Sequence, residues 1–482
     1  MPLNPSEYAS ASLGKLIAEA GKGRVGIDKR WISAILAKPA EDAARSLTTY
    51  GSKPPQDARV QIDGDILNLL AQIPSIASID YICTLLREGF EEIPESLLQI
   101  TRRAGTQAVE PLVKVYRDLD EDASGEVAFI LAGLGIKDSR IYDILIERLD
   151  YDMEDGAMLL GLYGDPAGLI PLTKLSTEVG KNREIDFAIE QLKHVPQLAV
   201  EEPEMNFLDD YPDYALPEFE VMSDEEIVEF ATGHEDEAVR LAALDVLEDL
   251  DLPASVAKPL LGLATGNDST SVRAAAFRTL ARLNQIEEVR AAAEALLTDT
   301  SQSGALRAAS LITLLPDSIT PQRVRAYIEE FTANPESRAD GVHAMWRSRE
   351  ASYSSKFGTF LSDPDLAVRR QAIRGAGVCG DVTAIAQLRD LMMDEDLRKD
   401  AIFAYAMAVP SDISSSRVKS LFTRIEKEAG GLNSDEATSV GVALDMRLEA
   451  AGKEPVFFQQ AGDEDEDDHG HDHHHHDHGH KH

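Results

Sequence analysis

The sequence predicts an all-α protein, an α-solenoid built from stacked antiparallel helix pairs. Three observations predict this fold: an arginine recurs at nearly constant spacing, apolar residues around it recur with a helical period, and the composition favours packed helices. Hydrophobic residues make up 43% of the 482 residues, but aromatic residues only 6%, a balance typical of closely packed helices rather than of β-sandwiches. A repeat array also lets a chain of this length fold without one oversized core.

The recurring arginine marks the repeat in the C-terminal half. Its occurrences are separated by 29 to 34 residues, and they are Arg240, Arg273, Arg307, Arg338, Arg369 and Arg398. Each arginine lies near the start of a segment with helical apolar spacing, and a second apolar stripe follows after a short break. Each period therefore predicts two short antiparallel helices. One such hairpin cannot bury its own apolar face, so neighbouring hairpins must stack on one another.

An acidic or amide residue precedes most of the arginine-bearing segments, at Asp236, Asp268, Asn334, Asp365 and Asp394. Such residues are good helix N-caps because their side chains accept hydrogen bonds from amides that have no partner within the helix. We expect the arginines to pair with these acids, within a repeat or between repeats. The row of arginines is then a structural ladder rather than a set of catalytic residues.

The N-terminal half repeats more loosely. Leu134, Leu162 and Leu192 lie 28 and 30 residues apart, and the segment GLYGDPAGLIPL matches GAGVCGDVTAIAQL in the other half. The pattern D-x-x-V-R-x-x-A, followed by G-x-x-G-D and a Leu-rich helix, resembles the HEAT-like repeats first described in phycobilisome lyase subunits. The resemblance covers about residues 65–450 and is strongest over Phe230–Met407. It implies a HEAT-like superhelix and says little about function, because such arrays serve as scaffolds, chaperones and occasional enzymes.

The same patterns divide the chain into five parts: a helical cap over 1–60, weaker HEAT-like repeats over 61–200, a linker over 201–222, HEAT-like repeats over 223–452 and a tail over 453–482. The linker is acidic and rich in proline and aromatic residues, so no helix can run through it. It is either an ordered connector along the solenoid or a partner-docking or autoinhibitory segment.

Charge restricts the classes of partner. The chain carries a net charge of −38, which disfavours binding to nucleic acid and to membrane surfaces. The sequence contains no apolar run long enough to span a membrane and no recognisable secretory signal at its start. Its two cysteines, Cys83 and Cys379, argue against a disulfide framework and fit a reducing compartment. We therefore expect a cytoplasmic protein with a protein partner.

The tail is the one segment with metal-binding composition. We expect it to be disordered, and its acidic run is followed by nine histidines: His469, His471, His473, His474, His475, His476, His478, His480 and His482. Neutral imidazole is a good ligand for divalent transition metals. The tail therefore predicts binding of Ni²⁺ or Zn²⁺. Because the hairpins supply their own core, folding is expected to require no cofactor.

The remaining histidines, His194, His234 and His343, are scattered along the chain. The pair His234-Glu235 was compared with deoxyhypusine hydroxylase, a HEAT-like enzyme whose di-iron site uses several His-Glu pairs. The corresponding positions, Asn267-Asp268 and Pro364-Asp365, cannot supply the other ligands. No catalytic residue is therefore nominated, and we expect a protein that is not an enzyme.

Three functions remain compatible with the sequence. The leading one is a HEAT-like scaffold or adaptor for protein–protein interaction, with a C-terminal metal-binding tail. The alternative is a metal-handling accessory protein that stores Ni or Zn or delivers it to a client enzyme. A more distant alternative, which rests on the repeat resemblance alone, is a lyase-like or chaperone role on a cofactor-bearing protein.

Overall fold

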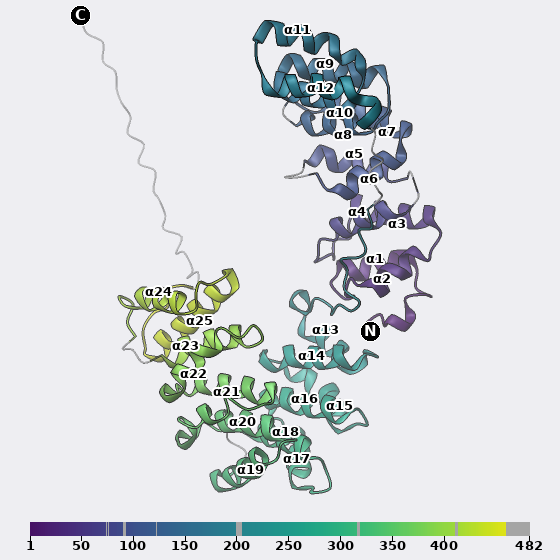
Figure 1. The fold of residues 1–482 in the computed structure, drawn as a ribbon. Helices are drawn as coiled ribbons and strands as arrows, with labels where there is room; N and C mark the ends of the chain where they lie inside the picture. Colours follow the sequence, from purple (N-terminus) through teal and green to yellow (C-terminus); the bar gives the residue numbers. More distant parts are fainter. Residues whose placement is uncertain are drawn as a thin grey trace, which may run out of the picture. The chain divides into compact units, whose positions relative to one another are not determined.

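The structure is a computed structural model that describes residues 1–458 apart from residues 74, 76, 90–92, 122, 199–204, 316–318 and 410–412. The described residues form 25 α-helices and several short 3-10 helices, and they contain no β-strand. Consecutive helices pack in neighbouring pairs (Figure 1). The predicted all-α solenoid of HEAT-like type is confirmed. No helix within the described ranges is long and apolar enough to cross a membrane.

The chain forms two compact units, Met1–Val246 and Leu247–His482. The boundary lies within helix α14 (Glu237–Asp249). The first unit also contains α1 (Leu13–Gly21), α2 (Lys29–Leu36), α3 (Ala40–Ser52), α4 (Asp63–Gln72), α5 (Ile79–Glu88), α6 (Glu95–Ala104), α7 (Thr106–Asp118), α8 (Ser124–Gly133), α9 (Ser139–Tyr151), α10 (Met153–Tyr163), α11 (Leu169–Val179), α12 (Arg183–Leu198) and α13 (Asp224–Gly233).

In the first unit every second helix belongs to one continuous row. Helices α4, α6, α8, α10 and α12 each contact the next, and α5, α7, α9 and α11 pack beside them as a second row (Figure 1). Small residues permit this close packing. A Cβ on Gly156 of α10 would come within 2.3 Å of the Leu149 backbone on α9, so a larger side chain there would force the two helices apart.

Residues 205–222 of the acidic linker belong to the first unit and lie along its row of helices. The Gln99 side chain of α6 holds both backbone groups of Met205, accepting from its N–H at 2.9 Å and donating to its carbonyl at 3.1 Å. Tyr211 reaches α4, where its hydroxyl donates to Asp65 at 2.6 Å. Further along, the Lys29 amide at the start of α2 donates to the Pro212 carbonyl at 3.0 Å. This part of the linker is therefore an ordered connector.

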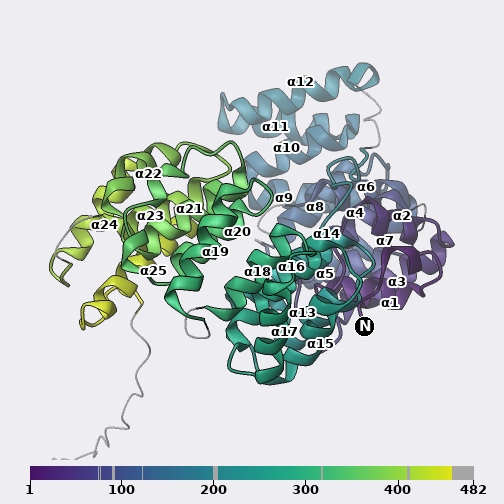
Figure 2. The same cartoon turned by 90° about the horizontal axis from the view of Figure 1, so that it is seen from below.

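The second unit repeats the two-row arrangement. One row consists of α16, α18, α20, α21, α23 and α25, each in contact with the next (Figure 2). The other row consists of α15, α17, α19, α22 and α24. The bounds are α15 (Ala257–Thr265), α16 (Thr270–Leu280), α17 (Glu287–Thr298), α18 (Gly304–Leu314), α19 (Pro321–Ala333), α20 (Arg338–Arg347), α21 (Leu366–Val378), α22 (Ile385–Leu391), α23 (Arg398–Ala408), α24 (Val418–Glu428) and α25 (Ser434–Ala450).

From Arg273 onward the recurring arginines lie in the first two turns of successive helices of this row, as the repeat predicts, and Arg240 has the same place in α14. For Arg273, Arg307 and Arg338 a main contact is the end of the preceding helix. Arg273 donates to the Ala264 carbonyl of α15 at 3.1 Å, and Arg307 donates to the Leu297 carbonyl of α17 at 3.1 Å. Arg338 donates in the same way to the Thr332 carbonyl of α19 at 3.0 Å. The arginines therefore cap helix C-termini, where carbonyls lack partners and the helix dipole favours a cation.

The acids that pair with Arg307 and Arg338 differ from the five residues singled out in the sequence. The acid that pairs with Arg307 is Glu330, and the acid that pairs with Arg338 is Asp363. Asp365 does cap α21, by accepting from the Ala367 amide at 2.8 Å. Before α16 and α20, however, the N-cap position is a serine, so Asp268 lies one residue and Asn334 three residues before the N-cap. Asp236, Asp365 and Asp394 each accept a hydrogen bond from the backbone amide two residues further on.

Candidate functional site

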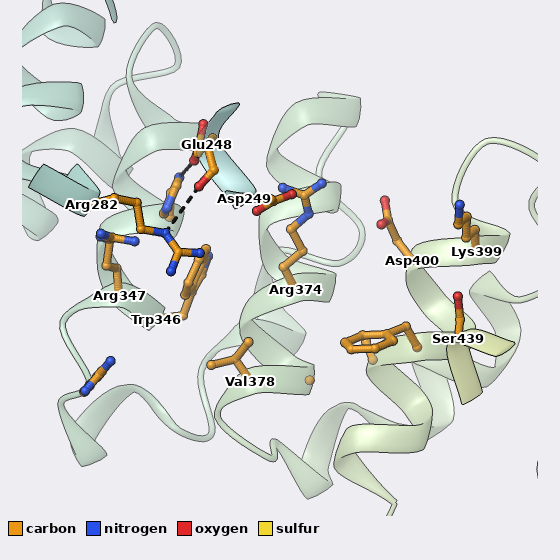
Figure 3. A pocket seen from close by; sticks show the side chains of 15 residues that line it. Glu248, Asp249, Arg282, Trp346, Arg347, Arg374, Val378, Lys399, Asp400 and Ser439 are labelled. Carbon is orange, nitrogen blue, oxygen red and sulfur yellow. Dashed lines mark hydrogen bonds and ion pairs between the residues drawn. The ribbon is translucent and has the colours of Figure 1, made fainter. Parts of the chain in front are cut away.

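The second unit contains a cavity of about 530 Å³ along its first row of helices. Its lining combines five basic side chains with three acidic ones, two aromatic rings and one histidine. Basic residues come from the 3-10 turn after α16, from α20 and the loop after it, from α21 and from α23: Arg282, Arg347, Arg349, Arg374 and Lys399 (Figure 3). We call this cavity the basic pocket. Its five basic side chains are unusual in this protein, because the whole chain carries a net charge of −38.

Most of these cations are not neutralised by the protein. Arg282 lies 3.6 Å from Asp251, but Arg347, Arg349, Arg374 and Lys399 form no ion pair with any residue that the structure describes. Burial lowers the pKa of Arg347, which shows that its charge is held at a cost in solvation. A ligand with negative charge would relieve that cost. Four of the five basic side chains in the lining therefore have no ion-paired carboxylate among the described residues.

Among the acids of the pocket, Glu248 lies close to other ionisable side chains of the protein. Its carboxylate lies 3.3 Å from Arg278 and 3.6 Å from the His343 ring. Asp249 and Asp400 remain in the lining, where they would repel a ligand that placed negative charge close to them. The positive part of the lining is therefore the sector around Trp346, which Figure 3 shows between Arg347 and Arg374.

An aromatic stack forms one wall of the basic pocket. The rings of His343 and Trp346 on α20 are parallel, with an interplanar angle of 8° and centroids 4.5 Å apart. Trp346 is fixed by a hydrogen bond of 3.2 Å from its indole N–H to Gln371 on α21. His343 is almost completely buried, and neither of its ring nitrogens has a hydrogen-bond partner among the described residues. Polar groups that are buried without a partner are rare and often belong to binding sites.

The loop after α20 holds Arg349 in an unusual backbone conformation. Its φ is +55°, and it is the one non-glycine residue with positive φ in the described ranges. A left-handed backbone costs an arginine on the order of 1 kcal/mol. Such strain persists where the surroundings enforce it, and here it accompanies placement of a cation in the pocket lining. The arrangement can bind a carboxylate or phosphate beside an apolar or aromatic group.

The unpartnered histidine makes the second unit sensitive to acid. Burial and the charges of Arg278, Arg347 and Arg374 hold the pKa of His343 well below its ordinary value of 6.5. The unfolded chain takes up a proton on this histidine near pH 6.5, whereas the folded chain does not. The free energy of unfolding is therefore highest above pH 6.5 and decreases as the pH is lowered below that value. We expect a loss of about 1.4 kcal/mol between pH 7.5 and 5.5 from this group.

Urea unfolding followed by the fluorescence of Trp346, in a Trp31→Phe background, measures this loss. His343→Phe keeps the stack and removes the proton site, so its stability should change less with pH than that of the parent. His194→Gln changes an exposed histidine and should keep the parental slope. A parental slope in His343→Phe would show that His343 is not the group that responds.

Of the histidines discussed in the sequence analysis, His343 lines the basic pocket. The tail histidines His469–His482 lie outside the described residues. His194 is exposed on α12 beside Glu190, at 2.9 Å, and His234 is a buried C-cap of α13 that stacks on Phe230. No group of three or more possible metal ligands occurs within the described ranges. Burial raises the pKa of Cys83 and Cys379 to about 11, which makes both thiols poor nucleophiles.

Comparisons with known proteins show no family for this chain. No family model and no curated protein matches the chain. Solved structures that match include human deoxyhypusine hydroxylase in complex with glycerol, at 17% identity, with 66% of this chain and 98% of that chain covered and a TM-score of 0.20. Kap121p bound to Pho4p matches at 12% identity over 93% of this chain and 53% of that one, with a TM-score of 0.27.

A structure of TOG domain arrays of microtubule polymerases, described as a basis for tubulin recruitment, matches at 12% identity over 83% of this chain and 99% of that chain, with a TM-score of 0.23. For Kap121p the chain spans about half of the matched protein. All three scores are below 0.5, so these likenesses assign neither an activity nor a partner to this chain. They also leave the phycobilisome lyase type of repeat as an expectation from the sequence.

Proposed function

We propose that this protein is a HEAT-like scaffold that binds a protein partner, and that the basic pocket of its second unit receives an acidic segment of that partner. The observation that carries the proposal is that four of the basic side chains that line the pocket form no ion pair with the described residues, in a chain that is otherwise strongly acidic. Electrostatic complementarity favours a ligand that pairs carboxylates with the guanidinium groups and lays an apolar side chain on the indole ring.

A binding role fits this lining better than a catalytic one. Ser439 is the one hydroxyl group among the lining residues, and the His343 nitrogens have no hydrogen-bond partner within the described ranges. A nucleophile needs a base within hydrogen-bond reach. We therefore keep the interpretation that the protein is not an enzyme as part of the proposal.

A fluorescent peptide of alternating Glu and Leu tests the pocket by anisotropy. We expect Arg374→Glu and Lys399→Glu each to weaken binding by roughly tenfold, because each replaces an attraction with a repulsion at a partly desolvated site. Lys419→Glu makes the same charge change on an exposed lysine of α24 outside the pocket and should leave affinity nearly unchanged. Equal losses in all three variants would show only a general charge effect and would contradict the proposal.

Two further arms complete the experiment. The titration is repeated on a chain that ends at Gln460, because the acidic run Asp463–Asp468 competes for any cationic site. A single-stranded oligonucleotide serves as the second probe. If the oligonucleotide binds the pocket more tightly than the peptide, the partner is a nucleic acid rather than a protein, and the proposal fails.

The histidine-rich tail supports a second candidate function, the handling of Ni²⁺ or Zn²⁺ for a client protein. Nine histidines in the last fourteen residues are the observation that favours it. Imidazole ligands on one short segment bind divalent transition metals with little selectivity. In this second candidate function, the helical repeats bind the client protein and the tail supplies the metal ion. The scaffold role does not depend on it, so the two candidates are separable by removing the tail.

A further inference from the structure

The first row of helices in the first unit carries a regular series of side chains at one position. Counting along α4, α6, α8, α10 and α12, the residues in the second turn are Asn68, Gln99, Phe129, Met158 and Phe187, separated by 29 to 31 residues. The five helices follow one another in space (Figure 1). We call these five residues the rungs. Their even spacing places them in a line along one face of the row.

The first two rungs are occupied by the chain itself. Asn68 donates to the Tyr211 hydroxyl at 3.1 Å, and Gln99 forms two hydrogen bonds with the backbone of Met205. The Gln99 amide satisfies backbone groups, so this contact does not depend on the side chain of the residue that it holds. This face of the row therefore binds a non-helical segment of the chain, residues 205–211, in which residues 207–210 form a turn.

The last three rungs are apolar and uncovered. The exposed fraction is 36% for Phe129, 49% for Met158 and 63% for Phe187. Leu162, one turn beyond Met158 on α10, is exposed by 45%. The described part of the linker lies along α6, α4 and α2 and makes no hydrogen bond to α8, α10 or α12. A contiguous apolar stripe of this kind on a solvent-facing surface marks an interaction site.

Acidic residues accompany the rungs. Three positions before each apolar rung, on the same helix face, lie Glu126, Asp155 and Glu184. Asp155 is paired with Arg148 at 2.8 Å, but Glu126 and Glu184 form no ion pair within the described ranges. At the corresponding position of α4, Asp65 accepts the hydrogen bond from Tyr211. The acidic position is therefore also used to hold the linker.

From this continuity we infer that the rungs Phe129, Met158 and Phe187 bind an extended segment of a protein partner in which apolar side chains alternate with basic ones. Adjacent helices lie about 8–10 Å apart, so the three rungs span about 20 Å, which an extended chain covers in about six residues. The apolar side chains cover the rungs and the basic side chains face Glu126 and Glu184. This surface is in the first unit and is independent of the basic pocket in the second.

A fluorescent peptide of about twelve residues, with Leu alternating with Lys and one proline that prevents a helix, is the probe. Anisotropy with the full chain should give saturable binding, and a peptide with Glu in place of Lys should bind far more weakly. The double variant Met158→Ser, Phe187→Ser should lose roughly tenfold or more in affinity, as expected for central apolar contacts. Glu126→Gln with Glu184→Gln should lose less and should flatten the salt dependence.

The matched control lies on the other row. Ile170 on α11 is exposed by 79% and Glu178 of the same helix pairs weakly with Lys174, so Ile170→Ser with Glu178→Gln removes the same kinds of group away from the rungs. This control should keep the parental affinity. If control and test variants lose affinity equally, binding is a general effect of the acidic surface and the inference fails. Sedimentation that shows dimerisation abolished by Met158→Ser, Phe187→Ser would instead assign the surface to a second copy of the chain and would also overturn it.

Discussion

Replacing Arg398 with alanine is expected to lower the unfolding free energy of the last two hairpins by about 3–5 kcal/mol. This arginine makes five hydrogen bonds. It donates to both carboxylate oxygens of Glu436 at 2.6 and 3.2 Å and to the carbonyls of Met392, Ala429 and Gly431 at 2.8 to 3.0 Å. It thus joins the ends of α22 and α24 to the start of α25. Its loss leaves the buried carboxylate of Glu436 without its cation and three carbonyls without a donor.

Hydrogen exchange measures the loss of stability in each helix separately. Amides of α24 and α25 should exchange with a lower opening free energy in Arg398→Ala, while those of the first unit should not change, because a repeat array loses stability locally. Arg369→Ala is the matched control, since the Arg369 side chain forms no ion pair with the described residues and its Nε has no partner among them. An equal effect of the two substitutions would show that the hydrogen bonds of Arg398 add nothing to stability.

Removal of the residues after Gln460 is expected to abolish nearly all binding of Ni²⁺ and Zn²⁺. The full chain should bind several ions by calorimetry, and binding should weaken as the pH falls through about 6.5, because imidazole must be neutral to act as a ligand. The truncation keeps the last described contacts intact: the Asp445 carboxylate accepts from the amides of Val456, Phe457 and Phe458 at 2.7 to 3.3 Å. Chelator should leave helical circular dichroism and the melting temperature nearly unchanged in both proteins.

Equal metal stoichiometry with and without the tail would contradict this expectation. The ligands would then lie before Gln460, and His194, His234 and His343 would be the first residues to replace. That result would also reopen the question of an enzymatic metal site. The truncated chain itself provides the control for folding, since its helical signal must match that of the full chain.

The repeat could be predicted from the sequence because helix pairs of one size impose one spacing. The arginines from Arg273 to Arg398 all lie near the start of helices of one row. Their contacts could not be predicted, because the carbonyls at the end of each preceding helix carry no sequence signal. Arg369 shows the limit of periodicity. The chain before it forms short 3-10 helices, Ala351–Tyr353 and Phe357–Thr359, instead of a helix of the second row, and so offers this arginine no helix end to cap.

The basic pocket could not be predicted for a different reason. Its cations lie at unrelated positions of their repeats, from Arg282 to Lys399, and only the stacking of the helices brings them together. The rungs, by contrast, share a regular spacing that is visible in the sequence. Phe129, Met158 and Phe187 are spaced by 29 residues, but exposed and buried apolar residues look alike in a sequence until the face that each helix buries is known.

The basic pocket has a mechanical consequence, because its lining is drawn from separate repeats. Arg347 belongs to α20, Arg374 to α21 and Lys399 to α23, and each of these helices is held mainly by its immediate neighbours. A small rotation between repeats therefore changes the separation of the cations. A ligand that binds cations of two repeats at once would limit the rotation of these repeats relative to each other. By the same linkage, a movement that separates these repeats weakens binding of the ligand.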